Sequence, residues 1–294
     1  MRDGALLCYG FVGLGLMGGS FAQAIREKVL AQGTGRILAV DRNPWVLSGA
    51  IDAGVIDAGF QPEESRRMLK QCDVVFVCLY PKQTIEFLKK ERAFFKKGSL
   101  VTDISGVKGT LDAHLDAILT GDFDFVSAHP MAGSEKEGFT HAQAKIFENR
   151  NYIIVPHPQN KPENITFLKN LMTAIGFTRI IETDAQTHDA KIAFTSQLCH
   201  IIASVLVDSA EDTNITSFGG GSFEDLTRIA MINAPLWTEL FLSNRKKLLD
   251  RIDSFETSLC RVKKMVEEDD YASLCRLLED IRAKRIEMGG QDTK

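Results

Sequence analysis

Along the first half of the chain, short apolar runs alternate with longer stretches in which apolar residues recur at helical spacing. The apolar runs are rich in Val, Ile, Leu and Phe and have the length of strands buried on both faces. Strands that alternate with helices predict right-handed crossovers and a parallel sheet covered by helices on both faces. The predicted strands are Leu7–Val12, Arg36–Asp41, Asp73–Leu79, Ser99–Ile104, Asp124–Ala128 and Asn151–Val155. The predicted helices are Met17–Lys28, Trp45–Ala53, Glu63–Gln71, Thr84–Arg92 and Leu111–Leu119.

The pattern changes after residues 156–164, which are rich in proline and polar residues. One further helix and strand are predicted, at Ile165–Ile175 and Thr178–Ile181, and no strand is predicted from Asp184 onward. We therefore predict two domains. The first, over residues 1–183, is an α/β domain with a doubly wound parallel sheet of the Rossmann type. The second, over residues 184–294, is all-α.

Two long stretches of the second domain carry more apolar surface than so small a domain can cover. Ala185–Asp208 is apolar almost all round, which predicts a helix buried on every side. Within a second predicted helix, Leu236–Val266, apolar residues recur in alternating steps of four and three, the spacing of a packing seam. We therefore predict a homodimer formed through these helices.

The composition limits the class of protein. The chain has 294 residues, of which 44% are hydrophobic and 25% charged, as in folded proteins. A net charge of −4 and a pI near 5.9 argue against nucleic-acid or anionic-membrane partners. We see no uncharged apolar run of about 18 residues and no signal-peptide cleavage pattern, so we expect a cytoplasmic protein without a membrane span. The six cysteines form no CxxC pair, so we expect reduced thiols and no metal site.

The first predicted strand ends in a glycine-rich loop. Gly13, Gly15 and Gly18 match the GxGxxG pattern of dinucleotide-binding loops, directly before a predicted helix. The first glycine permits a tight turn, the second lets the backbone approach a pyrophosphate, and the third lets the helix pack closely. The helix N-terminus offers free N–H groups to the phosphates. We expect the intervening residues of the loop, Leu14, Leu16 and Met17, to contact the cofactor as well.

Asp41 ends the second predicted strand, where a carboxylate can bond the ribose hydroxyls of NAD and repel the 2′-phosphate of NADP. Arg42 follows, and a neighbouring guanidinium can tolerate that phosphate. The pattern thus favours NAD as the cofactor and leaves tolerance of NADP open. In the purely structural alternative, the glycines make a tight turn and Asp41 caps the next helix.

Hydride transfer to NAD leaves the protein to handle the substrate's proton, for which histidine is the commonest group near neutral pH. His129 directly follows a predicted strand, at the edge where open α/β sheets bind ligands. Pro130 prevents helix continuation, and the small residues after it, Ser134 among them, leave space for a ligand. The alternative is a histidine satisfied within a turn. We expect three other histidines at the surface, namely His114, His141 and His157.

Two further candidates lie in the predicted helical domain. His200 falls in the apolar helix, with Gln197 on the same face, and such a histidine needs a polar partner or a pocket. A histidine bonded inside a subunit interface is the alternative. Arg228 follows three glycines and enters an apolar segment, where a guanidinium suits a substrate carboxylate. Its alternative is an internal salt bridge to Asp225 or Glu224.

Five motifs now occur in one order along the chain: GLGLMGGS (13–20), TDISGVKG (102–109), AHPMAGSEKEG (128–138), TSQLCHIIA (195–203) and FEDLTRIA (223–230). Together, over roughly residues 8–250, they closely resemble the prephenate dehydrogenase family, the prephenate and arogenate dehydrogenases of tyrosine biosynthesis. The HPMAGSE and DLTRIA motifs are far more specific than the glycine loop.

The resemblance implies an oxidative decarboxylation. NAD+ takes hydride from the ring carbon that carries the hydroxyl of prephenate, the ring carboxylate leaves as CO2, and 4-hydroxyphenylpyruvate forms. The resemblance further implies that His129 accepts a hydrogen bond from the ring hydroxyl, that Arg228 binds a substrate carboxylate, and that His200 lines the site.

The chain departs from the family pattern at two places. Relatives often read DxGSVK, whereas here Ser105 precedes Gly106. We expect Ser105 to reach the substrate hydroxyl or the nicotinamide. Relatives commonly carry histidine where this chain has Gln197, and glutamine cannot become cationic. We expect Gln197 to contact the substrate, with a changed recognition of its side-chain carboxylate.

Two rival functions use the same elements. Dehydrogenases of β-hydroxyacids or imines share the GLGxMG loop and rely on a lysine in the second domain, where Lys191 lies. A regulatory protein that senses NAD would keep the fold and lose the chemistry. The sequence favours a prephenate dehydrogenase. It does not decide between prephenate and arogenate, or whether tyrosine inhibits.

Overall fold

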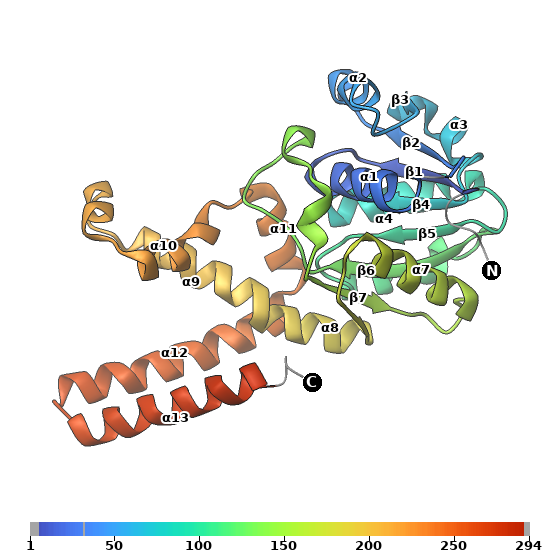
Figure 1. The fold of residues 1–294 in the computed structure, drawn as a ribbon. Helices are drawn as coiled ribbons and strands as arrows, with labels where there is room; N and C mark the ends of the chain where they lie inside the picture. Colours follow the sequence, from blue (N-terminus) through green and yellow to red (C-terminus); the bar gives the residue numbers. More distant parts are fainter. Residues whose placement is uncertain (1–5, 32, 291–294) are drawn as a thin grey trace. The chain divides into compact units, whose positions relative to one another are not determined.

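The computed structural model describes residues 6–31 and 33–290 (Figure 1). The chain up to Asn244 forms one compact unit, and the helices that follow form another. All the site residues predicted above lie in the first unit.

An eight-stranded sheet runs through the first unit in the order β3-β2-β1-β4-β5-β6-β7-β8. From β3 to β6 all neighbours are parallel, and the strand order reverses between β1 and β4, so the predicted doubly wound Rossmann arrangement is confirmed. The strands are β1 Cys8–Val12, β2 Arg36–Val40, β3 Ala58–Phe60, β4 Val74–Val77, β5 Leu100–Asp103, β6 Asp124–Pro130, β7 Asn151–Val155 and β8 Arg179–Glu182. Strand β3 was not predicted, because its three residues include a glycine and only one large apolar side chain.

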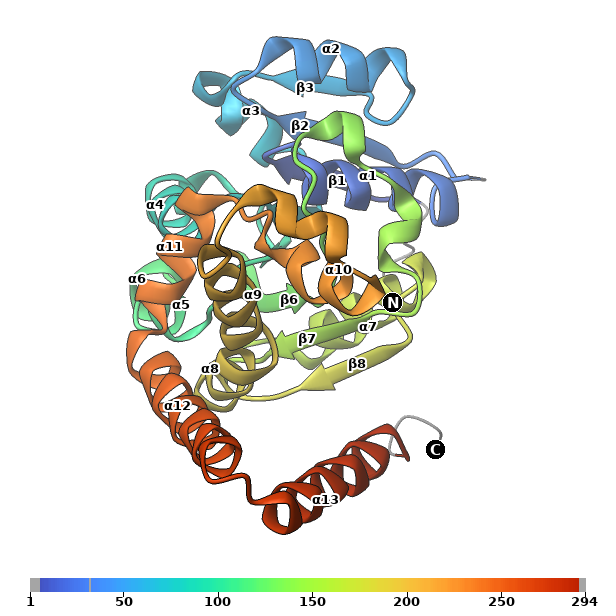
Figure 2. The same ribbon diagram turned by 90° about the vertical axis from the view of Figure 1, so that its left-hand side faces the viewer.

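The far side of the sheet differs from an all-parallel arrangement. Strand β7 pairs antiparallel with β6, and β8 then pairs parallel with β7, so Figure 2 shows β7 and β8 pointing opposite to β6. The connection 131–150 holds only short 3-10 turns, so it returns at the same edge of the sheet instead of crossing a face as a helix. This connection therefore starts and ends at the edge where His129 lies.

Helices cover both faces of the sheet. They are α1 Leu16–Lys28, α2 Pro44–Asp52, α3 Ser65–Leu69, α4 Pro81–Glu91, α5 Gly109–Asp112, α6 Leu115–Ile118 and α7 Pro162–Ile175. On one face, the Phe21 ring of α1 stacks on Phe76 of β4, with 5.1 Å between ring centroids. On the other, Leu88 of α4 and Ile118 of α6 belong to the cluster that covers Val101 of β5. The single helix predicted over Leu111–Leu119 is two short helices, α5 and α6.

From Asp184 to Asn244 the described chain contains helices and no strand. These helices are α8 Ala185–Ile192, α9 Leu198–Asp208, α10 Gly221–Thr227 and α11 Ala234–Ser243. Between α8 and α9 the chain makes one π-helical turn over Ala193–Gln197, in which the Leu198 N–H bonds the Ala193 carbonyl. The turn inserts one extra residue into an otherwise continuous helix.

The prediction that Ala185–Asp208 is buried on every side does not hold within one chain, because Phe194, Val205 and Val207 are exposed. By length and composition this helix is apolar enough to cross a membrane, which for a single helix is weak evidence, since core helices pass the same test.

The single helix predicted over Leu236–Val266 is wrong. Helix α11 ends at Ser243, and α12 spans Arg245–Glu267. Asn244 separates them, since its backbone leaves the helical region and its buried amide binds partners outside the helix. In the second unit, α12 packs against α13, Tyr271–Gly290. Several residues of the predicted seam on α12, among them Phe255, Leu259 and Val266, are exposed in the single chain.

Candidate active site

The glycine loop has the geometry that each glycine predicts. Gly13 has a φ of 89°, and its N–H bonds the Val40 carbonyl at 2.8 Å. A Cβ at Gly18 would lie 2.1 Å from the Gly13 carbonyl oxygen, so the start of α1 must approach β1 without a side chain. A Cβ at Gly15 would meet nothing within 4 Å. The space beside Gly15, at the start of the 13-residue helix α1, is open to a phosphate group.

Asp41 is held against this loop. Its Oδ2 accepts the Leu14 N–H at 2.8 Å, and its Oδ1 accepts the Asn43 N–H at 2.9 Å. These bonds fix the carboxylate at the end of β2 and leave lone pairs on both oxygens for ribose hydroxyls. Arg42 is exposed beside it.

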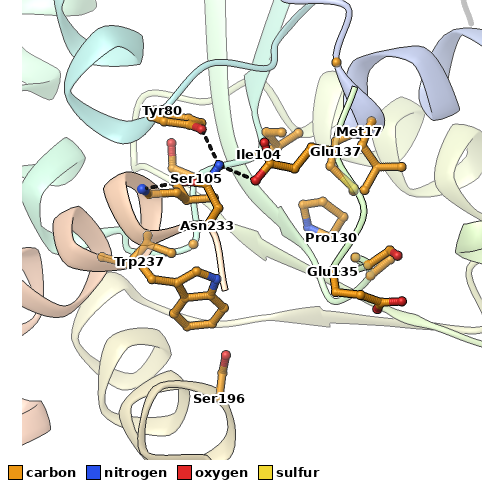
Figure 3. Close-up of a pocket in the computed structure, with 18 of the residues that line it drawn as sticks. Met17, Tyr80, Ile104, Ser105, Pro130, Glu135, Glu137, Ser196, Asn233 and Trp237 are labelled. Atoms are coloured by element: carbon orange, nitrogen blue, oxygen red, sulfur yellow. Dashed lines mark hydrogen bonds between the residues drawn. The ribbon is translucent and has the colours of Figure 1, made fainter. Parts of the chain in front are cut away.

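A cavity of about 730 Å³ extends from the glycine loop to the helices after residue 184. Figure 3 shows Met17, Ile104, Pro130 and Trp237 around it. Of the predicted site residues, those that line it are Gly15, Leu16, Met17, Gly18, Ser105, His129, Ser134, Gln197, His200 and Arg228. The structure thus brings residues from both predicted domains to one cavity. Gly13, Leu14, Asp41 and Arg42 are not among the residues that line it.

His129 lies at the end of β6, and its ring contacts a residue of the second half of the chain. Its Nδ1 lies 3.0 Å from Nε2 of His188, whose Nδ1 lies 2.8 Å from Oδ1 of Asp189. The Nε2 of His129 is near Gly106, where an added Cβ would lie 3.7 Å from it. Burial lowers the pKa of His129 well below its usual value, and His188 and Lys108 lower it further. His129 is therefore neutral at neutral pH.

The Asp189 carboxylate is fixed from the other side. Its oxygens accept the backbone N–H groups of Lys108 and Gly109, both at 2.8 Å. Burial alone would raise the pKa of Asp189, but the hydrogen bonds from His188, Lys108 and Gly109 outweigh it and lower that pKa. Asp189 is thus a carboxylate.

Behind His129 lies a buried ion pair between Lys108 and Asp103, with 2.8 Å between Nζ and Oδ2. Their side chains are 1% and 0% exposed. Lys108 also donates to the Ala128 carbonyl, and Asp103 accepts from the Ala128 N–H at 3.1 Å. Burial lowers the pKa of Lys108, and the attraction of Asp103 opposes this. The pair anchors the strand end that carries His129.

Ser105 has a buried hydroxyl beside the cavity that makes no hydrogen bond to the described residues. Its backbone N–H bonds Asp103 at 2.9 Å, but its buried Oγ has no hydrogen-bond partner among the described residues. A buried hydroxyl normally has a partner, and Ser105 lines the cavity. This hydroxyl is therefore an unpaired polar group in the wall of the cavity.

Gln197 lines the cavity, but its amide is engaged with the protein. Its Nε2 donates to the Leu240 carbonyl at 2.9 Å, and its Oε1 accepts from Asn244 at 2.8 Å. The predicted contact of Gln197 with substrate stays a prediction.

His200 faces the cavity beside an aromatic ring. Its ring stacks on Trp237 with 3.6 Å between centroids, and its Nδ1 lies 2.9 Å from the Ser196 carbonyl. Burial lowers the pKa of His200, and Arg228 adds to that effect while the Ser196 carbonyl opposes it.

Arg228 reaches across to the loop after β6. Its nearest ion-pair partner in the structure is Glu135, at 3.5 Å, rather than the Asp225 or Glu224 of the structural alternative. The Arg228 side chain is 58% exposed. Neighbouring Ser134 accepts the Lys136 N–H at 3.2 Å.

Sequence reasoning missed several residues of this site. Asn233, at the start of α11, donates to the Tyr80 hydroxyl at 2.9 Å and to Glu137 at 2.7 Å, which ties three segments together at the cavity (Figure 3). The His188–Asp189 pair was also missed, although two adjacent polar residues at the start of an apolar helix were a usable signal.

The glycine loop is followed by an acid at the next strand end and adjoins a cavity with a neutral histidine. This arrangement is typical of dehydrogenases that bind a dinucleotide cofactor. The sequence matches the prephenate dehydrogenase nucleotide-binding domain over residues 21–182 and the prephenate dehydrogenase dimerization domain over residues 184–280. The chain therefore belongs to the prephenate dehydrogenase family.

Individual relatives agree with this assignment. The chain is 29% identical to the prephenate dehydrogenase of Bacillus subtilis, covering 97% of this chain and 76% of that one. It is 30% identical to the prephenate dehydrogenase of Lactococcus lactis, covering 92% and 74%. A crystal structure of prephenate dehydrogenase from Aquifex aeolicus, in complex with hydroxyphenyl propionate and NAD+, superposes with a TM-score of 0.85 at 29% identity over 96% and 98% of the two chains. The family and fold predicted from the sequence are confirmed, and the protein is an oxidoreductase.

Proposed function

We propose that the protein catalyses the NAD-dependent oxidative decarboxylation of prephenate to 4-hydroxyphenylpyruvate. The observation that carries this proposal is the shared cavity, in which His129, the glycine loop and Arg228 meet. Family membership and the NAD+ complex of the Aquifex relative support it. Arogenate, which carries an amino group in place of the side-chain keto group, is the alternative substrate.

The residues of the loop fit NAD. Gly15 leaves open space at the start of α1, and the fixed Asp41 carboxylate suits ribose hydroxyls while repelling a 2′-phosphate. When bound, NAD+ supplies the hydride acceptor. We propose that Gly13 to Gly18 hold its pyrophosphate and that Asp41, with Arg42 beside it, holds the adenosine ribose.

His129 acts on the substrate hydroxyl. As a neutral imidazole it accepts a hydrogen bond from the ring hydroxyl and so increases electron density at the carbon that loses hydride. Hydride departure removes two electrons, and loss of the ring carboxylate as CO2 returns its bonding pair to the ring, which becomes aromatic. The product keeps the hydroxyl as a phenol, so no net proton leaves through His129. Ser105 supplies a second polar contact beside the same hydroxyl or the nicotinamide.

Arg228 and His200 position the substrate. Arg228 is only loosely paired with Glu135, so its remaining donors are available to grip a carboxylate bidentately. His200, stacked on Trp237, lines the same wall. We assign Gln197 and Ser134 to the substrate pocket as well.

The rival readings find less support. Lys191, which a β-hydroxyacid or imine dehydrogenase would require, is exposed and is not among the described residues that line the cavity. A protein that only senses NAD would not need a neutral His129 held by His188.

We further propose a cytoplasmic homodimer, with a nucleotide-binding domain over residues 1–183 and a helical domain over 184–294. The dimerization-domain match and the exposed apolar side chains of α9 and α12 support the assembly. Sedimentation of the purified chain at several concentrations measures it, and a monomer at micromolar concentration would contradict it.

The function is tested by measuring NADH formation with prephenate and with arogenate, each with NAD and NADP. We expect the highest kcat/KM for prephenate with NAD. A folded protein that binds NAD and oxidises neither substrate would overturn the proposal.

A further inference from the structure

The contacts of His129 determine which of its two ring nitrogens carries the proton. A neutral histidine has one N–H and one bare nitrogen, and the partner of one nitrogen sets the state of the other. Among residues 6–31 and 33–290, the only hydrogen-bond partner of His129's ring is His188, at Nδ1, while Nε2 lies near Gly106 in the cavity wall. The state of His188 therefore decides what His129 offers to a ligand.

The state of His188 is decided in turn by Asp189. Its carboxylate already accepts two backbone N–H groups and can only accept, so Nδ1 of His188 must be the donor in their 2.8 Å contact. Burial lowers the pKa of His188, and Lys108 lowers it further, although the bond to Asp189 opposes them. His188 is then neutral, with a bare Nε2.

A bare Nε2 on His188 can only accept, so Nδ1 of His129 must carry the hydrogen in their 3.0 Å contact. The remaining nitrogen of His129, Nε2, is then a lone pair directed at the cavity. The charged groups that face this pair of rings are Asp189 from α8, Lys108 from the start of α5 and Asp103 from the end of β5. All are themselves held by the bonds described above.

We propose that His188 is a positioning residue that holds His129 in the tautomer with a bare Nε2, and that Asp189 sets the direction of the chain of hydrogen bonds. The inference rests on the proposed function, in which that nitrogen accepts the substrate hydroxyl. His188 does not line the cavity, and its side chain is 0% exposed, so it acts only through His129. The link also joins the strand end of the first predicted domain to the first helix of the second.

The tautomer is measured directly in the complete protein with 15N-labelled histidine. Long-range 1H–15N correlation spectra distinguish protonated from bare ring nitrogens, and His129→Asn identifies the His129 signals by their loss. We expect hydrogen on Nδ1 and a bare Nε2 in both His129 and His188. Hydrogen on Nε2 of His129 in the wild-type protein would overturn the proposal.

Two variants at one position test the consequence. His188→Leu removes the acceptor, and we expect kcat to fall about 10- to 100-fold while KM changes less than about threefold. His188→Gln can place a carbonyl oxygen where Nε2 was, so we expect it to recover kcat to within about fivefold of wild type. The matched control is His141→Leu, at an exposed histidine, which should leave kcat unchanged.

These results separate a positioning role from a merely structural one. The proposal fails if His188→Leu stays within twofold of wild type, or if His188→Gln is no better than His188→Leu. If His188→Leu does not fold, the proposal is still tested by the tautomer of the wild-type protein and by the kcat of His188→Gln. If the wild type oxidises neither prephenate nor arogenate, the proposed function fails. The tautomer measurement does not depend on activity and tests the hydrogen bonds from His129 through His188 to Asp189 by itself.

Discussion

Lys108 and Arg228 both serve the same cavity, but their surroundings are opposite. Lys108 is 1% exposed, pairs with Asp103 at 2.8 Å and supports the strand end that carries His129. Arg228 is 58% exposed, and its contact with Glu135 is 3.5 Å long. Lys108 is enclosed by fixed hydrogen-bond partners, whereas Arg228 has N–H donors that remain available to a ligand.

This difference indicates separate roles for the two sides of the cavity: catalysis at His129 and substrate binding at Arg228. A group that acts on reacting atoms must be held within a narrow geometry, and buried, fully bonded neighbours provide that. A group that captures a charged substrate must exchange protein or water contacts for ligand contacts, so a tightly satisfied guanidinium would bind poorly. The comparison predicts rate defects on the His129 side and affinity defects on the Arg228 side.

The largest effect is expected from His129→Asn. Asparagine cannot supply the imidazole acceptor, so kcat should fall by about 10² to 10⁴, with little change in KM. Steady-state kinetics with prephenate measure both constants. A variant that raises KM and preserves kcat would mean that His129 belongs to substrate capture.

Removing the buried cation should cost stability. Lys108→Met leaves the Asp103 carboxylate buried without its counter-ion, and we expect the free energy of unfolding to fall by about 3 to 5 kcal/mol. Urea denaturation of both proteins measures this change.

Lys169→Met is the matched control, because Lys169 pairs with Glu182 where both side chains are about two-fifths exposed, at 39% and 42%. Its loss should cost no more than about 1 kcal/mol. Equal losses in the two variants would refute the contrast between a buried and an exposed cation.

Arg228→Ala should act on affinity. Loss of a charge-assisted contact to a substrate carboxylate should raise KM about 10- to 100-fold and change kcat less. Arg228→Lys keeps the charge without the bidentate fork and should fall between alanine and wild type. A kcat defect larger than the KM defect would place Arg228 on the catalytic side.

The smallest effect concerns pH. His129 must be neutral to accept a hydrogen bond, and burial, His188 and Lys108 hold its pKa well below its usual value. As pH falls, kcat/KM should therefore stay constant through about 6.5, where free histidine takes up its proton, and decline only below it. If kcat/KM fell to half its maximum at about pH 6.5 or above, burial would not lower the pKa of His129 in the way described here.

Much of this arrangement follows from local patterns in the sequence. The apolar runs predicted seven of the eight strands of the sheet within a few residues, because strands buried on both faces, as most of these are, carry continuous apolar side chains. The spacing of Gly13, Gly15 and Gly18 predicted a loop that the structure reproduces, since each glycine answers a local steric need. His129 was found because the end of a parallel strand marks a ligand-binding edge.

The rest depends on contacts between distant residues. Nothing in the sequence pairs Lys108 with Asp103, and only the fold shows that they bury one another. The break at Asn244 interrupts the stretch that was predicted as one helix, because its side chain binds the Asp189 carbonyl and Gln197. Strand β7, NYIIV, is an apolar run like the parallel strands of the sheet, although it runs antiparallel to β6, so its direction is set by the connection and not by its residues.

The π-helical turn at Ala193–Gln197 affects how sequences of this family can change by insertion and deletion. Each residue in an α-helix advances the azimuth by about 100°, but the π-turn absorbs one extra residue, so deleting one residue within the turn would straighten the helix and leave His200 beside Trp237. The deletion would be nearly invisible to a measure of helix content. A homologue that is one residue shorter in this turn therefore keeps this wall of its pocket, whereas a deletion elsewhere in α8 or α9 would rotate one half of the helix by about 100° relative to the other.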